Sequence, residues 1–278
     1  MQHALLLPPN GELSDPRVFG PLAAAAEAAG WEGLFLWDHV LRSPDQVGAI
    51  GDPWICLAAA AVTTKRIRIG TMVTPITRRR PIKLAREAVS LDQLSSGRLT
   101  LGLGLGVDSY GELSKLGEIV DARTRGQRLD EGVELLCRFW TGEQVDHRGE
   151  HFVADGVTVL PRPVQQPRVP LWFAARGEAR KPVRRAARYD GIFPVDVTEE
   201  TLRAMLDLIA SERGSLDGFD VAGRPSADLS YETLTEIGVT WMFTGVQPGA
   251  TRAEVESIAT SDPVSAFDRP ELRPGARR

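Results

Sequence analysis

The chain has 278 residues, 42% of them hydrophobic, which is long enough to bury a large core. Its 33 Lys and Arg residues and 37 Asp and Glu residues give a formal net charge of −4, which argues against nucleic acid or a membrane surface as a general partner. The first apolar stretch is too short for a secretory signal and no run approaches the roughly 18 apolar residues of a membrane span, so the sequence predicts a cytoplasmic protein.

Strand and helix patterns alternate along most of the chain. The first helix pattern has Asp15 as a candidate N-cap and Pro16 as its first residue, and it ends at Gly30. The strand patterns cover residues 3–7, 33–37, 67–73, 99–104, 171–174, 191–195, 219–222 and 239–244. The helix patterns cover residues 15–30, 52–64, 81–95, 123–140, 178–188, 199–213, 230–237 and 252–260. Eight alternating units predict an α/β fold, a single (β/α)8 TIM barrel.

Two segments fall outside this alternation. Residues 142–170 alternate short β-prone runs with Gly and Pro, which predicts a hairpin-like insertion after the fourth helix. Residues 263–278 are rich in Pro, Arg and Gly, and we expect them to be a flexible C-terminal tail. The barrel domain is therefore predicted to cover residues 1–262.

The chemistry of such barrels lies where strands end, so the residues just past each strand are the first candidates for a site. Asp38 and His39 follow the second predicted strand. Histidine exchanges protons near neutral pH, so His39 can serve as an acid or a base, although a structural histidine that caps the loop is an equally good interpretation. Residues 71–74, 104–108 and 174–178 hold corresponding positions after later strands.

Alternating glycines mark the fourth predicted strand. Their spacing is GxGxG, and Val107 stands where a dinucleotide-binding loop would have its third glycine, so that interpretation is disfavoured. Glycines on one face of a strand leave room for a flat ligand, or they fit a tightly packed barrel interior. Gly104, Gly106 and Asp108 are therefore candidate cofactor contacts.

An anion site is predicted after the fifth barrel strand. Ala174, Ala175, Arg176 and Gly177 lie between a strand and a helix N-terminus, where backbone amides and the helix dipole favour a phosphate. The basic run at residues 78–80 is either a solvated loop or a cationic feature at the barrel mouth. The four histidines lack the spacing of clustered metal ligands, so we predict no metal site.

Combined, these segments resemble the luciferase-like monooxygenases, which include FMN enzymes and enzymes that use the deazaflavin coenzyme F420. The matching segments are GWEGLFLWDHV, IRIGTMVTPITRRRP, LDQLSSGRLTLGLGLG, ARTRGQRLDEGVELLCRFWTGE, LPRPVQQPRVPLWFAA and AARYDGIFP, in family order across nearly the whole chain. The resemblance implies a barrel with an insertion, often a homodimer, whose flavin or deazaflavin lies over the strand ends.

The resemblance also implies roles for individual residues. Asp38 and His39 match a pair beside the reacting ring, with His39 as acid or base toward the substrate and Asp38 orienting it or bonding to the cofactor. A second match is a bulge that supports the ring through a non-proline cis peptide, expected here between Met72 and Val73; the matching residues are Thr71, Met72, Val73 and Thr74. Residues 174–177 match the family's phosphate loop.

Three departures and the choice of cofactor complete these expectations. Arg176 stands where many relatives have a small residue, the last strand segment GVTWMFTG lacks a common acidic residue, and a short loop after the fourth strand predicts an open pocket. Compact length, the Asp-His pair and basic residues near the mouth favour F420 and hydride transfer to or from a small-molecule substrate. The alternatives are an FMN-dependent two-component monooxygenase with a separate flavin reductase, and a non-catalytic flavin-binding protein of the same fold.

Overall fold

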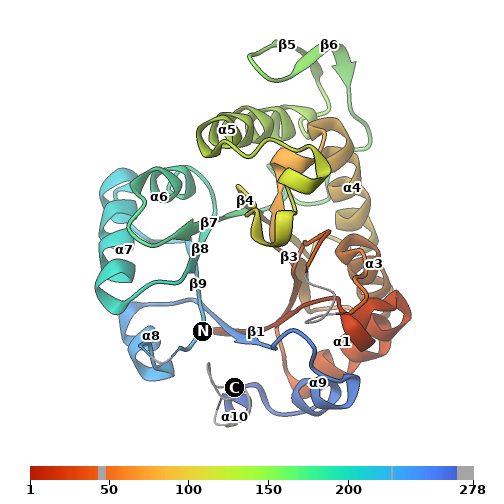
Figure 1. Cartoon of the computed structure of the whole chain (residues 1–278), viewed down its shortest axis with the longest axis vertical. Helices are drawn as coiled ribbons and strands as arrows, with labels where there is room; N and C mark the ends of the chain where they lie inside the picture. The colour runs from red at the N-terminus through yellow and green to blue at the C-terminus, as the bar shows by residue number, and fades with distance from the viewer. Residues whose placement is uncertain (43–47, 227, 268–278) are drawn as a thin grey trace.

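The computed structural model describes residues 1–42, 48–226 and 228–267. Eight parallel strands close into a barrel in the order β1-β10-β9-β8-β7-β4-β3-β2, with helices around the outside (Figure 1). The strands are β1 (Gln2–Leu7), β2 (Gly33–Leu36), β3 (Arg68–Pro75), β4 (Leu99–Gly104), β7 (Leu171–Arg176), β8 (Gly191–Val195), β9 (Asp220–Gly223) and β10 (Trp241–Gly245). The predicted TIM barrel is confirmed.

Several outer helices begin with a capping side chain or with a proline in the first turn. Asp52 accepts hydrogen bonds from the backbone N–H groups of Trp54 and Ile55. The first helix differs from its prediction, because Asp15 caps a 3-10 turn, η2 (Pro16–Val18), and the α-helix begins only afterwards. The helices are α1 (Phe19–Ala29), α3 (Pro53–Thr63), α4 (Pro81–Leu94), α5 (Ala122–Phe139), α6 (Arg180–Ala186), α7 (Glu199–Arg213), α8 (Tyr231–Ile237) and α9 (Arg252–Ala259).

The insertion is an antiparallel hairpin of β5 (Gln144–Arg148) and β6 (Val153–Thr158). It projects beyond α5 at the edge of the molecule (Figure 1). Glu131 of α5 attaches it to the barrel, because its carboxylate accepts hydrogen bonds from His147 Nε2 at 2.9 Å and from the backbone N–H of Phe152 at 2.8 Å. The predicted insertion after the fourth helix is confirmed.

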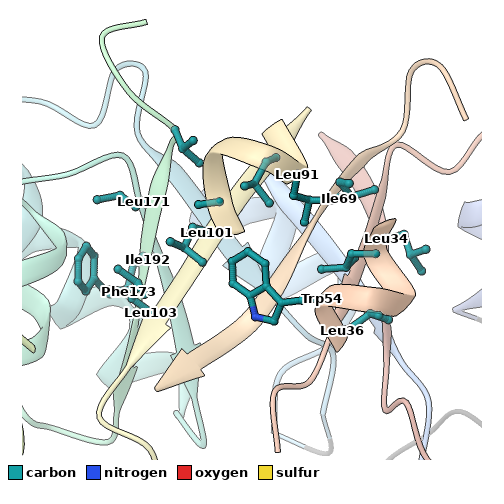
Figure 2. Close-up of a cluster of buried hydrophobic side chains, with 14 of the residues drawn as sticks. Leu34, Leu36, Trp54, Ile69, Leu91, Leu101, Leu103, Leu171, Phe173 and Ile192 are labelled. Carbon is teal, nitrogen blue, oxygen red and sulfur yellow. The ribbon is translucent and has the colours of Figure 1, made fainter. Parts of the chain in front are cut away.

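Alternation along the strands separates two hydrophobic cores. Outward-facing residues such as Leu34, Ile69 and Leu101 pack under the helices, as Figure 2 shows together with Trp54 of α3. The inward-facing residues form a smaller core inside the barrel: Ala4, Leu6, Phe35, Met72, Trp172, Ala222, Trp241 and Phe243. The inner core fills the barrel, so ligands can bind only at its ends.

The segment after the last barrel helix departs from the expected flexible tail, because its first residues are helical. Residues Pro263–Ala266 form a short helix, α10, in which Pro263 and Ala266 are buried, and the ring of Phe267 lies 5.9 Å from that of His3 on β1. Apolar contact therefore attaches this segment to the barrel. The rest of the predicted tail, residues 268–278, lies outside the described residues. None of the described helices is long and apolar enough to cross a membrane.

Candidate active site

The carboxyl end of β3 contains a bulge next to β4. The pairing of β3 with β4 shifts between Thr71 and Thr74, and the Met72–Val73 peptide bond is cis, as the family resemblance predicts. A Cβ at Gly102 would lie 2.2 Å from the Thr71 carbonyl oxygen, and one at Gly104 would lie 2.7 Å from Val73 Cγ2. The alternating glycines therefore admit the bulge itself, which favours tight packing as the reason for their spacing, and cofactor contact at Gly104 remains a prediction.

Asp38 is buried beside this bulge. Its Oδ2 atom accepts hydrogen bonds from Thr74 Oγ1 at 2.7 Å and Arg79 Nη2 at 2.9 Å, and from Trp54 Nε1 at 3.3 Å. These donors come from β3, from the segment after it and from α3, so the Asp38 carboxylate connects three elements around the end of β2. These hydrogen bonds give Asp38 a structural role at the end of β2, and a bond from Asp38 to a cofactor remains a prediction.

His39 bonds to a carboxylate that sequence reasoning missed. Its Nδ1 atom lies 2.9 Å from Oε2 of Glu112, so the expectation that Asp38 orients His39 is corrected. The other oxygen, Oε1, accepts from the Val40 backbone N–H at 2.6 Å and from Arg78 Nη1 at 2.8 Å. Glu112 is only 2% exposed, and although burial opposes its ionisation, the His39 hydrogen bond, the Val40 N–H and the Arg78 charge lower its pKa.

Glu112 lies in the loop between β4 and α5, among the 3-10 turns η4 (Ser109–Gly111) and η5 (Ser114–Leu116). Glu112 thus reaches from this loop to His39 beyond the end of β2. An open pocket remains the expectation, since none of the loop's described residues lines the cleft beside His39. Because the loop has no periodic pattern, Glu112 carried no sequence signal except its acidic side chain at the carboxyl end of a barrel strand.

Arg78 joins the two acidic residues. Besides its bond to Glu112, it donates from Nη2 to the backbone carbonyl of Asp38 at 2.7 Å, and its side chain is 6% exposed. A solvated loop is thus the wrong interpretation for this arginine. The neighbouring Arg79 also points inward, onto the Asp38 carboxylate.

Partly exposed apolar side chains form a floor at the same end of the barrel. Trp37, Val73 and Phe193 pack on the inner core and remain partly accessible, and the ring of Phe193 lies 5.7 Å from that of Phe243 beneath it. Ala174 at the end of β7 is also partly accessible. Accessible apolar side chains of this kind can contact one face of an aromatic ring system.

A shallow cleft lies beside these side chains, with about 220 Å³ of empty space, a figure that includes open solvent. His39, whose side chain is 25% exposed, contributes one of its walls. The residues that line the cleft are Pro8, Pro9, Asn10, Trp37, His39, Arg42 and Ile50. The cleft thus brings the predicted acid or base together with apolar walls and one cation.

The predicted phosphate loop differs in detail from its prediction. Ala174, Ala175 and Arg176 belong to β7 and pair with β8, and the Gly177 N–H donates to the Val195 carbonyl at 3.4 Å. Ala175 is buried in the outer core, so its side chain faces away from the barrel mouth. Arg176 is exposed and pairs with Asp196 at 3.0 Å. Helix α6 begins only at Arg180, so the amide groups of residues 174–177 are not those of a helix N-terminus.

The remaining two candidates organise the loop that carries Glu112. Asp108 accepts from the backbone N–H groups of Leu113 at 2.7 Å and Ser114 at 2.9 Å, and these bonds lower the pKa of its carboxyl. The carbonyl of Gly106 accepts from Arg125 Nη1 at 2.7 Å. Both residues have a structural role here, and cofactor contact by either remains a prediction. Across the three described ranges, no cluster of three or more His, Cys, Asp or Glu residues is arranged to hold a metal ion.

The closed parallel barrel thus places a histidine, a buried carboxylate and accessible apolar side chains at the carboxyl ends of its strands. The chain belongs to the luciferase-like monooxygenase family, whose model matches residues 5–230.

Individual relatives use different cofactors. The F420-dependent glucose-6-phosphate dehydrogenase of Nakamurella multipartita is 32% identical over 236 residues, which are 84% of this chain and 66% of that protein. The oxygenase component of flavin-dependent trigonelline monooxygenase from Acinetobacter baylyi is 38% identical over 125 residues, 45% of this chain and 34% of that protein. The chain spans less than two thirds of the length of either relative.

Among solved structures, an F420-dependent secondary alcohol dehydrogenase in complex with an F420-acetone adduct aligns with a TM-score of 0.78. The alignment covers 96% of this chain and 98% of the other at 19% identity. This likeness concerns the fold.

Proposed function

We propose that the protein is an oxidoreductase that uses the deazaflavin coenzyme F420 for hydride transfer to or from a small organic substrate. The observation that carries the proposal is the His39–Glu112 pair at the edge of an apolar floor and a cleft. The relative from Nakamurella multipartita, which is F420-dependent by name, supports this choice of cofactor.

The residues at the barrel end fit a flat redox ring. Val73, Trp37 and Phe193 would contact one face of the ring, because they are the apolar side chains that stay accessible above the inner core. Arg176, exposed at the end of β7, would face the phosphate side. When bound, the deazaflavin supplies a carbon centre that accepts or donates a hydride, while the protein positions it and limits access of water.

The contact between His39 and Glu112 indicates which nitrogen of the imidazole carries the hydrogen. A Glu112 carboxylate with a lowered pKa is ionised near neutral pH, so it accepts a hydrogen bond and Nδ1 carries the hydrogen. In a neutral imidazole with this tautomer, Nε2 is the nitrogen with a lone pair. In the oxidation direction Nε2 would take the proton of a substrate hydroxyl, and in the reduction direction it would return a proton to the carbonyl oxygen.

The test is a titration of the purified protein with F420, FMN and reduced FMN, followed by ring fluorescence or absorbance. We expect saturable binding of F420 in preference to either flavin. His39→Ala should retain this binding and reduce turnover about 100-fold or more if His39 transfers a proton. His39→Asn is the matched control, because its amide can still donate to Glu112 but cannot act as an acid or base. Unchanged turnover in both variants would exclude the proposed role of His39.

An FMN-dependent two-component monooxygenase is the second candidate. The identity to the oxygenase component from Acinetobacter baylyi favours it, and such an enzyme would need reduced FMN from a separate flavin reductase. Preferential binding of reduced FMN, with oxygen consumption, would support this candidate. Binding of a cofactor without any turnover would support a non-catalytic flavin-binding protein. Homodimer assembly and a cytoplasmic location also belong to the proposal, and light scattering and cell fractionation test them.

A further inference from the structure

Arg42 stands apart from the other arginines of the site. Arg78 pairs with Glu112, and Arg79 pairs with Asp38 and Glu87. Within the described residues, no carboxylate pairs with Arg42, and its Nε atom is buried without a hydrogen-bond partner. Among the described residues, Glu112 and Asp38 accept hydrogen bonds from Arg78 and Arg79, whereas Arg42 lines the cleft.

Aromatic rings fix the place of this guanidinium. Its carbon Cζ lies 5.5 Å from the ring centroid of Trp37 and 5.2 Å from that of Tyr110. Ring faces attract a cation but do not accept in-plane hydrogen bonds from the N–H groups at its edge, and the Nε atom of Arg42 is buried without an acceptor in the described part of the chain. The planar fork of an arginine matches the two oxygens of a carboxylate or a phosphate, so an anion is the ligand that these N–H groups suit.

The same cleft holds the proposed acid or base. Arg42 and His39 both line it, and the Trp37 ring contacts both, with 6.0 Å between the centroids of Trp37 and His39. A small molecule that contacts His39 from this cleft therefore also lies beside Arg42, because both residues line it. The other described lining residues, Pro8, Pro9, Asn10 and Ile50, include no second cation.

We propose that Arg42 binds an anionic group, a carboxylate or a phosphate, carried by the substrate close to its reacting carbon. The inference rests on the proposed function, because it makes this cleft the substrate site. It assigns the substrate to the class of small anionic hydroxy or oxo compounds. Arg42 thereby becomes a residue that determines specificity, while His39 retains the proton transfer.

The experiment titrates the wild-type protein and its variants with L-lactate and with glycerol 3-phosphate at constant ionic strength, followed by tryptophan fluorescence. Propane-1,2-diol and glycerol are the neutral counterparts that lack the anionic group. We expect saturable binding of at least one anion, weaker by about tenfold or more in Arg42→Gln and partly retained in Arg42→Lys. Arg203→Gln, an exposed change on α7, should bind like the wild type. A response to lactate alone indicates a carboxylate, and a response to glycerol 3-phosphate alone indicates a phosphate.

Any of three results overturns the inference. Two concern the wild type, which then binds the neutral counterparts as well as the anions or shows no saturable binding of either anion. The third is unchanged anion affinity in Arg42→Gln. A parallel F420 titration of the same variants separates this failure from failure of the proposed function. Binding of F420 without anion binding contradicts only the role of Arg42. Anion binding at Arg42 without F420 binding contradicts only the choice of cofactor.

Discussion

His39 and Glu112 are 73 residues apart in the chain, and their side chains meet at 2.9 Å. The contact joins the loop after β2 to the loop after β4. Because Arg78 bonds to the other oxygen of Glu112, the carboxylate is held from two sides and presents a fixed acceptor to the imidazole. The orientation of His39 thus depends on a residue far from it in sequence.

Glu112→Gln should lower turnover by about 10-fold to 100-fold while F420 affinity stays near that of the wild type. The amide keeps the size of the side chain but removes the charge that holds the hydrogen on Nδ1 of His39. Steady-state kinetics with separate determination of kcat and KM will measure the effect. Glu118→Gln, in the same loop, is the matched control and should leave both constants unchanged. An equal loss in the control would indicate that loop disorder explains the effect.

Glu27 should make the stability of the barrel depend on pH. Burial opposes its ionisation, but bonds from the backbone N–H groups of Ile67, Arg66 and Lys65 lower its pKa. A carboxyl with a lowered folded-state pKa stabilises the fold above its unfolded-state pKa, and this stability is lost as pH falls through the folded-state pKa.

In urea unfolding at pH 7, Glu27→Gln should reduce the free energy of unfolding by about 1 kcal/mol. The difference from wild type should shrink once the pH falls below the pKa of Glu27 in the folded protein. A difference that is constant with pH would contradict an electrostatic origin.

Gly102→Ala should destabilise the protein by about 3 kcal/mol. The added methyl group would lie 2.2 Å from the Thr71 carbonyl oxygen and 2.8 Å from Met72 Sδ. The first neighbour is a backbone atom and the Met72 side chain is buried, so neither can move away at low cost. Gly126→Ala in α5 is the control, since its Cβ would meet only Arg185 Nη2 at 4.0 Å. That change should be neutral or stabilising by up to about 1 kcal/mol, because alanine favours a helix interior. Thermal unfolding of both variants measures the contrast.

Arg176→Ala should weaken F420 binding by about tenfold if Arg176 contacts the phosphate. Its ion pair with Asp196 is exposed, so the free energy of unfolding should change by less than about 0.5 kcal/mol. Asp196→Ala removes the same ion pair but leaves the arginine charge, so it should bind F420 at least as well as the wild type. Equal weakening in the two variants would assign the effect to the loop and not to the charge.

The barrel itself could be predicted from the sequence because its pattern is local. Local signals mark many of the units, such as the N-cap Asp52 of α3 and the terminal glycine Gly30 of α1, where φ is +99°. Helix starts were less predictable. Pro16 fits both an α-helix and the 3-10 turn that it begins, and Glu178 precedes by two residues the start of α6.

The site was predicted only in part, because its contacts are long-range. His39 follows a strand and could be selected by position, and the cis bond at Met72–Val73 came from the family resemblance. Glu112 lies in a loop whose path depends on tertiary contacts, and Arg78 could not be distinguished from a solvated arginine until its acidic partners were known. The hydrogen bond from the Gly177 N–H to β8 likewise depends on how the strands pair, which the local sequence does not specify.

The contact between His3 and Phe267 joins the first strand to the last described residues at the amino ends of the strands, opposite the candidate active site. In addition β1 pairs with β10, so the first and last strands of the barrel are neighbours in the sheet. A circular permutant that links them and opens the chain at an exposed turn, such as Gly214 after α7, should rebuild the same barrel. The order in which the eight units follow one another would then change, while the arrangement of His39, Arg78 and Glu112 would not.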